Sequence, residues 1–171
     1  MRMMQWIGAI CVVGACGSCG FSVAATYRNL ERDLRQLKNG LEIMSCQMEY
    51  RLTELPELCT IVSSACTGLI GRLFHLLGDK LEAGGVSDVD TAMLLSMKEC
   101  GSIPTKCAEI LRQLASVLGQ TDLAGQLKGI ESIKAEIQRQ LTQLEAEKEG
   151  RMRSYRALGL CGGMALAILL L

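Results

Sequence analysis

Apolar residues recur in the middle of the chain at the spacing of one helix face. Between residues 27 and 52 they stand three and four residues apart, at Leu30, Leu34, Leu37, Leu41, Met44 and Met48. Alternating steps of four and three keep such residues in one stripe along an α-helix, as in a heptad repeat. Charged residues fill the other faces. The pattern predicts a long first helix that packs through this stripe.

A second helix is predicted over residues 57–82. Pro56 suits the first turn of a helix, since it lacks the N–H that this turn leaves unpaired. Gly84 and Gly85 are typical of a helix C-terminus. The apolar face assigned to this helix comprises Leu58, Ile61, Val62, Ala65, Leu69, Leu73, Leu77 and Leu81.

Three further helices complete the middle of the chain. Ser87 with Asp90 resembles a capping box and opens a helix to about Lys98. A fourth helix covers residues 105–118, after a break at Gly101 and Pro104. Asp122 suits the N-cap of a long fifth helix. The apolar positions of that helix are Leu123, Leu127, Ile130, Ile133, Ile137, Leu141 and Leu144.

No strand-like alternation or internal repeat interrupts these patterns. The fold class predicted is therefore all-α, a small bundle of about five helices. Its first and last long helices are expected to continue into apolar segments at the two ends of the chain. Because both would meet one bilayer from the same side, we expect them to lie antiparallel and side by side.

Residues 6–25 carry no charge over 20 positions. As a helix this stretch is about 30 Å long, the thickness of a bilayer's hydrocarbon core. Four basic residues follow it closely, so the positive-inside rule keeps the following domain in the cytoplasm. The alternative is a cleaved signal peptide, with Arg2 as its charged start and Ser22-Val23-Ala24 as its cleavage site.

Residues 157–171 form a second uncharged segment, preceded by Arg151, Arg153 and Arg156. We expect a second transmembrane helix there, with the middle of the chain again cytoplasmic. A buried C-terminal core helix is the alternative. Within this segment, a stripe of small residues comprises Gly159, Gly163 and Ala167. Such a stripe is compatible with close packing against another helix and equally with a lipid-facing surface.

The chain thus divides into a short tail over residues 1–5, a span over 6–25, a cytoplasmic bundle over 26–156 and a span over 157–171. Lysine and arginine number 18, as do aspartate and glutamate, so the formal net charge is zero. Nucleic-acid binding through phosphate neutralisation is therefore not expected.

The sequence offers little for catalysis. His75 is the lone histidine, and the cysteines of the middle region are odd in number, which favours reduced thiols packed as small apolar groups. Their spacing does not match the close pairs typical of zinc sites. The chain also lacks a phosphate-binding loop of the common type. We expect no enzyme activity, metal, cofactor or small-molecule substrate.

The turn before the last helix is the candidate contact point. The simplest interpretation of Leu118 to Gln126 is a helix stop, a turn and a cap. The other is that this exposed turn binds a partner, through Gly119, Asp122, Gln126 and Lys128.

Short motifs in a characteristic order resemble the stage III sporulation protein AB family of endospore-forming bacteria. They are Trp6-Ile7-Gly8, Leu34-Arg35-Gln36-Leu37, Glu49-Tyr50 before Leu55-Pro56, Gly85 with Ser87, Leu118-Gly119 with Asp122 and Gln126, and a leucine-rich tail. The chain departs from the expected pattern at Met93 and Leu94, where an aromatic residue was expected, and in a first span rich in cysteine and glycine.

The family is similar to a shortened form of the inner-membrane platform protein of type II secretion and type IV pilus machines. The resemblance implies a non-catalytic membrane scaffold in a channel between mother cell and forespore, required for endospore formation. It also implies that a secretion-type ATPase and other channel proteins are its partners. The alternative is a regulatory or signalling membrane protein that pairs through its heptad stripe, and a secreted domain with disulfides is a third.

Overall fold

The computed structural model describes the backbone of residues 2–51, 53–84, 88–119 and 122–170, and the side chains of residues 27–51, 53–84, 88–119 and 122–147. Over these residues the chain forms six α-helices and no strand. The helices are α1 (Arg2–Arg51), α2 (Leu55–Ala65), α3 (Gly68–Glu82), α4 (Val89–Cys100), α5 (Thr105–Leu118) and α6 (Leu123–Leu170). The predicted all-α class is confirmed.

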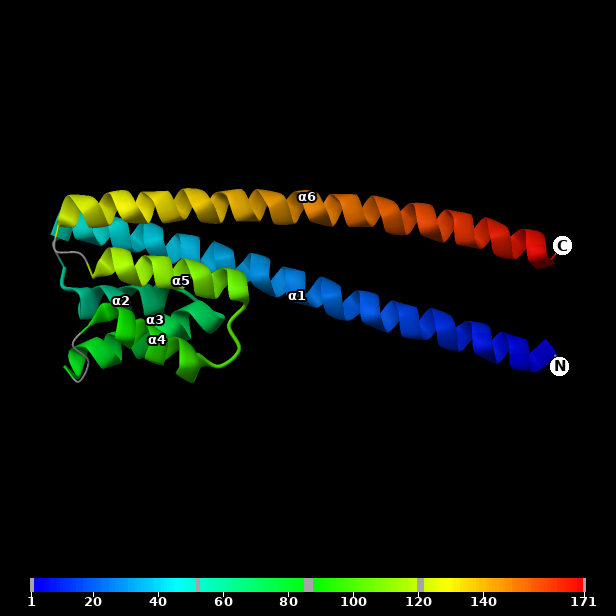
Figure 1. Ribbon diagram of the computed structural model, residues 1–171, viewed down its shortest axis with the longest axis horizontal. Helices are drawn as coiled ribbons and strands as arrows, with labels where there is room; N and C mark the ends of the chain where they lie inside the picture. Colours follow the sequence, from blue (N-terminus) through cyan, green and yellow to red (C-terminus); the bar gives the residue numbers. More distant parts are fainter. Residues whose placement is uncertain (1, 52, 85–87, 120–121, 171) are drawn as a thin grey trace.

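Two long helices, α1 and α6, lie side by side, and four shorter ones pack against one end of this pair (Figure 1). Both chain termini lie at the same end of the molecule. We call the opposite end, where α1 ends and α6 begins, the distal end. Polar contacts show that α1 and α6 run antiparallel, as predicted: Lys38 Nζ lies 3.0 Å from Gln138 Oε1, and Arg35 Nη2 lies 2.8 Å from Glu145 Oε1.

Each long helix is continuous, so the predicted extension of α1 and α6 toward the chain ends is confirmed at the level of the backbone. The two predicted membrane spans, residues 6–25 and 157–171, lie outside the residues whose side chains are described. Within the part of the chain that is described, no helix carries an apolar stretch long enough to cross a membrane.

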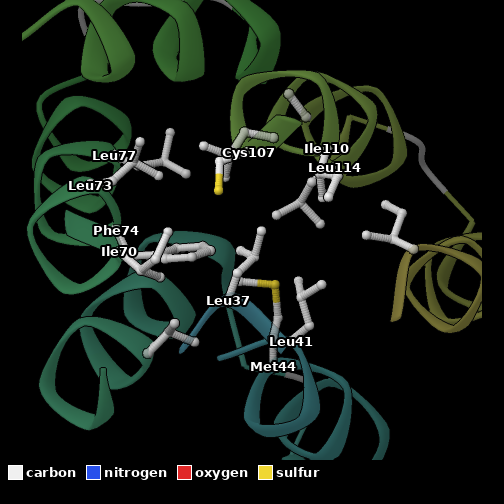
Figure 2. Packing of buried hydrophobic residues seen from close by; sticks show 14 of the residues in the cluster. Leu37, Leu41, Met44, Ile70, Leu73, Phe74, Leu77, Cys107, Ile110 and Leu114 are labelled. Carbon is white, nitrogen blue, oxygen red and sulfur yellow. The ribbon is translucent and has the colours of Figure 1, made fainter. Parts of the chain in front are cut away.

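The hydrophobic core is built on the stripe of α1. Leu34, Leu37, Leu41 and Met44 are fully buried. Figure 2 shows Leu37, Leu41 and Met44 facing α3 on one side, through Ile70, Leu73, Phe74 and Leu77, and α5 on the other, through Cys107, Ile110 and Leu114. The stripe of α6, from Ile130 to Leu144, is buried as well. Most of both heptad-like stripes is thus core, as their spacing predicted. Leu30 and Leu127 are half-buried, and Leu123, which was assigned to the apolar face of the last helix, is exposed.

The predicted helix over residues 57–82 is wrong in one respect, because the chain breaks within it. α2 ends at Ala65, and α3 begins at Gly68, whose φ is +68°. Gln36 of α1 stabilises the break through two hydrogen bonds to adjacent residues of the turn. Its side-chain oxygen accepts a hydrogen bond from the Thr67 N–H at 3.0 Å, and its backbone carbonyl accepts one from the Cys66 thiol at 3.3 Å.

The break also turns the apolar face of the second half. Ala65, assigned to the apolar face, is exposed, whereas Ile70 and Phe74, which that face omitted, are fully buried. A continuous helix would have kept one face along all 26 residues of the prediction. Two helices that meet at a turn instead fold back on each other, and each presents its own apolar side to α1.

The other boundaries agree closely with the predictions. α2 carries Pro56 in its first turn, and α5 has the predicted bounds. Gly84, with φ of +63°, follows α3, and Gly101, with φ of +90°, follows α4. The N-cap of α4 is Asp88, without a side-chain cap bond, and the predicted partner Ser87 lies outside the described residues.

Glycines permit close approach between helices at several crossings. A Cβ added to Gly71 would collide with the backbone carbonyl of Cys66, and one on Gly78 would lie 3.2 Å from Cys59 Cβ. At the crossing of α5 and α6, a Cβ on Gly129 would lie 2.5 Å from Val117 Cγ1. A methyl group there has no room unless the valine is cut back.

We therefore predict that the effect of Gly129→Ala on stability changes sign with the residue at position 117. In the natural chain the overpacking should outweigh the gain in helix propensity and lower the free energy of unfolding by about 1 kcal/mol. In a Val117→Ala background the same change should raise it by up to about 1 kcal/mol. Urea unfolding of the four variants in detergent micelles measures both effects, and equal effects in the two backgrounds would refute the close contact.

Candidate functional site

The turn between α5 and α6 brings the candidate residues together at the distal end. Asp122 caps α6 with both carboxylate oxygens, which accept hydrogen bonds from the backbone N–H groups of Ala124 at 3.3 Å and Gly125 at 3.0 Å. Gln126 donates from its side-chain amide to the carbonyl oxygen of Leu118 at 3.2 Å. The predicted cap is confirmed, and Gln126 joins the end of α5 to the start of α6.

The four candidate residues differ in how available they are. Gly119, Asp122 and Lys128 are exposed, whereas Gln126 is half-buried. The backbone N–H of Gly119 donates to the carbonyl of Ala115 at 3.0 Å, so this glycine continues the helical hydrogen bonding of α5. Gly119 and Gln126 therefore shape the turn, Asp122 caps α6 while its side chain remains exposed, and Lys128 presents an exposed charge that the turn does not use.

Two apolar side chains at the same end are exposed. Tyr50 was missed from the sequence, and Leu123 was wrongly assigned to the apolar face of the last helix. Tyr50 is 78% exposed in the last turn of α1, and Leu123 is 37% exposed at the first residue of α6. The register of the contacts between α1 and α6 places Tyr50 level with the first turns of α6. Tyr50 stands two positions beyond Met48 of the buried stripe, which turns it to the opposite side of the helix. The position of Tyr50 relative to the buried stripe could therefore have predicted from the sequence that its side chain is exposed.

The buried cysteine thiols are poorly suited to act as nucleophiles. Burial raises the pKa of Cys59 to about 12. Burial, and then the negative charge of nearby Asp33, raise the pKa of Cys107 to about 12. Both thiols are therefore neutral and weakly nucleophilic near pH 7. Cys66, also buried, donates a hydrogen bond from its thiol to a backbone carbonyl of α1.

His75 lies apart from these thiols on the exposed side of α3, where its Nδ1 is 3.4 Å from Asp79 Oδ1. Cys100 and Cys107, spaced seven apart, lie on two different helices, so they share no helix face. Among the described residues no three histidine, cysteine or acidic side chains come close enough to hold a metal ion.

A polar groove between α1 and α6 is lined in part by Arg35, Lys38, Glu42 and Glu145. Its charges already neutralise one another. Arg35 contacts both Glu31 and Glu145, at 3.0 and 2.8 Å, and Lys38 approaches Glu42 at 3.8 Å. The polar contacts in the groove therefore hold α1 and α6 in register, and the charged residues named here leave no unpaired charge for a small anion or cation.

These features define an all-α bundle whose candidate site is a contact surface at one end, without the side-chain groupings of a catalytic centre among the described residues. The comparisons with known proteins specify the class further. The model of the family "Stage III sporulation protein AB (spore_III_AB)" matches residues 5–171. The chain belongs to this family and has a role in sporulation, and the family is not known as one of enzymes.

Two relatives illustrate the likeness. Stage III sporulation protein AB of Bacillus subtilis (strain 168) is 26% identical over 172 residues, which cover 99% of this chain and 100% of the relative. A solved structure of stage III sporulation protein AB superposes with a TM-score of 0.62 and 24% sequence identity. It covers 69% of this chain and 94% of its own, and it shows the same fold.

We predict that Asp122 acts on stability through its cap and not through its charge. Asp122→Ala removes the acceptor for two N–H groups and should lower the free energy of unfolding by about 1 kcal/mol. Asp122→Asn keeps an acceptor oxygen and should stay close to the natural chain. Thermal unfolding in detergent micelles compares the two, and equal losses would point to the charge instead.

Proposed function

We propose that this chain is a non-catalytic scaffold of the sporulation apparatus, held in the mother-cell membrane around the forespore by spans at residues 6–25 and 157–171. The bundle over residues 26–156 then lies in the cytoplasm. Membership of the stage III sporulation protein AB family over residues 5–171 carries the proposal. The placement of both chain termini at one end of two antiparallel helices supports it, since two spans would then enter one bilayer together. Gly159, Gly163 and Ala167 would allow close helix packing there.

The partner we propose for the distal end is a secretion-type ATPase in the cytosol. From Gln126 to Arg156 the helix α6 is uninterrupted, and Arg156 stands 30 positions after Gln126, which corresponds to about 45 Å of helix. The turn that contains Asp122 and Lys128 would therefore lie far below the bilayer, within reach of a large cytosolic ring. The scaffold would hold the motor at a fixed distance from the membrane.

The alternative, a regulator that pairs with another coiled coil through the heptad stripe, needs that stripe to be accessible. Leu34, Leu37 and Leu41 are fully buried by the chain's own helices. Such pairing would require the bundle to open and expose its core, at a large cost in free energy. The scaffold is therefore the better proposal.

Topology can be tested with a natural cysteine. Cys46 is the one exposed thiol among the five whose side chains are described. We expect a membrane-impermeant maleimide to label it in inverted vesicles and not in intact mother cells or intact expression hosts. A Cys46→Ser variant identifies the signal that belongs to this residue. Labelling of Cys46 in intact cells would place the bundle outside and support the signal-peptide interpretation.

Docking at the α5–α6 turn can be tested by site-specific crosslinking. A photoreactive phenylalanine analogue at position 128 should form a crosslink to the secretion-type ATPase of the same organism when the two are co-expressed. The same analogue at Arg139, an exposed position on α6 three turns closer to the chain terminus, should not. Crosslinks from position 139 alone, or from neither position, would contradict docking at this turn.

A further inference from the structure

The distal end combines exposed apolar side chains with a strongly one-sided charge. Six exposed carboxylates join Asp122 there, at the end of α1, the start of α2, the end of α3 and the start of α4: Glu49, Glu54, Glu57, Glu82, Asp88 and Asp90. Among the described basic residues at this end, Arg51 and Lys128 are exposed, and Lys80 is bound to Glu99 at 2.7 Å. Tyr50 and Leu123 are exposed at the same end, Tyr50 on the side of α1 opposite its buried stripe.

Helix stability does not account for two of these carboxylates. Glu49 lies in the last turn of α1, and Glu82 is the last residue of α3. The backbone dipole leaves partial negative charge at a helix C-terminus, where an acidic side chain is unfavourable and a basic one favourable. In the described structure neither carboxylate has an ion pair that offsets this cost. Their charge therefore has no stabilising role in the helices that carry them.

Tyr50 is a second feature of the distal end that the stability of the fold does not explain. A tyrosine that is 78% exposed contributes little to the fold. Exposed aromatic side chains are over-represented among the residues that dominate binding at protein interfaces, where they fill apolar pockets inside a charged rim. Tyr50, with Leu123 at the same end, supplies such apolar anchors, and the carboxylates of the distal end supply the charge.

We infer that the distal end is a docking surface for a basic protein face with an apolar pocket that receives Tyr50. Charge complementarity selects this occupant, since anionic lipid and nucleic acid would both be repelled. The inference rests on the proposed function, in that the basic face is assigned to the ATPase. It adds the chemistry by which that ATPase is recognised.

The test measures binding of the purified secretion-type ATPase to the full-length protein in lipid nanodiscs, at about 50 and about 300 mM salt. Binding to the natural chain should weaken as salt rises. Glu49→Lys with Glu82→Lys should weaken binding about tenfold or more at low salt, mainly through slower association. Because both changes favour the helix dipoles, the melting temperature should stay the same or rise.

The matched control reverses two exposed carboxylates away from the distal end, Glu109→Lys with Glu147→Lys, and should leave affinity within about twofold. Tyr50→Ala should weaken binding about tenfold while keeping its salt dependence. If the natural chain binds and the distal reversal and Tyr50→Ala bind equally well, the inference is wrong while docking stands. If the natural chain itself does not bind, the proposed ATPase docking fails, and the inference with it.

Discussion

The stripe of apolar residues on α1 is the interaction on which the rest of the molecule depends. Four other helices, α2, α3, α5 and α6, pack against α1, whereas α4 packs on α3 and α5. Truncation of one buried leucine to alanine typically costs about 2–5 kcal/mol, and a domain's whole stability is about 5–15 kcal/mol. Loss of two such residues, for example Leu37 and Leu41, would therefore consume most of it. The exposed contacts of Arg35 and Lys38 with α6 are each worth far less.

This use of the stripe limits how the protein meets partners. A heptad pattern is commonly interpreted as a surface for pairing with another chain, but here most of its side chains are buried inside the bundle. What remains for recognition is surface that the fold does not need. The distal end fits that description, because Tyr50 and Leu123 are exposed there, whereas Met44, Met48 and Ile130 of the same two helices are buried.

The sequence predicted the parts of the fold that are local. The stripes of α1 and α6, the cap at Asp122 and the bounds of α5 follow from spacing and from single residues. The break at Thr67 did not, because apolar residues continue at helical spacing across it and the side chain that stabilises it, Gln36, is 31 positions away. The acidic distal end was missed for a related reason: its carboxylates come from the ends of separate helices, and the fold alone gathers them.

The arrangement separates the residues that fold the protein from those that would bind its partner. An acidic residue at a helix C-terminus gives up about 0.5 kcal/mol, which is small beside the contribution of one buried leucine of α1. Glu49 and Glu82 can therefore be kept for binding without endangering the fold. Because α6 is continuous from the distal turn toward the chain terminus, a load applied at Leu123 is borne by backbone hydrogen bonds along the whole helix. The exposed residues of the distal end can thus be replaced without altering the buried stripe of α1 that holds the bundle together.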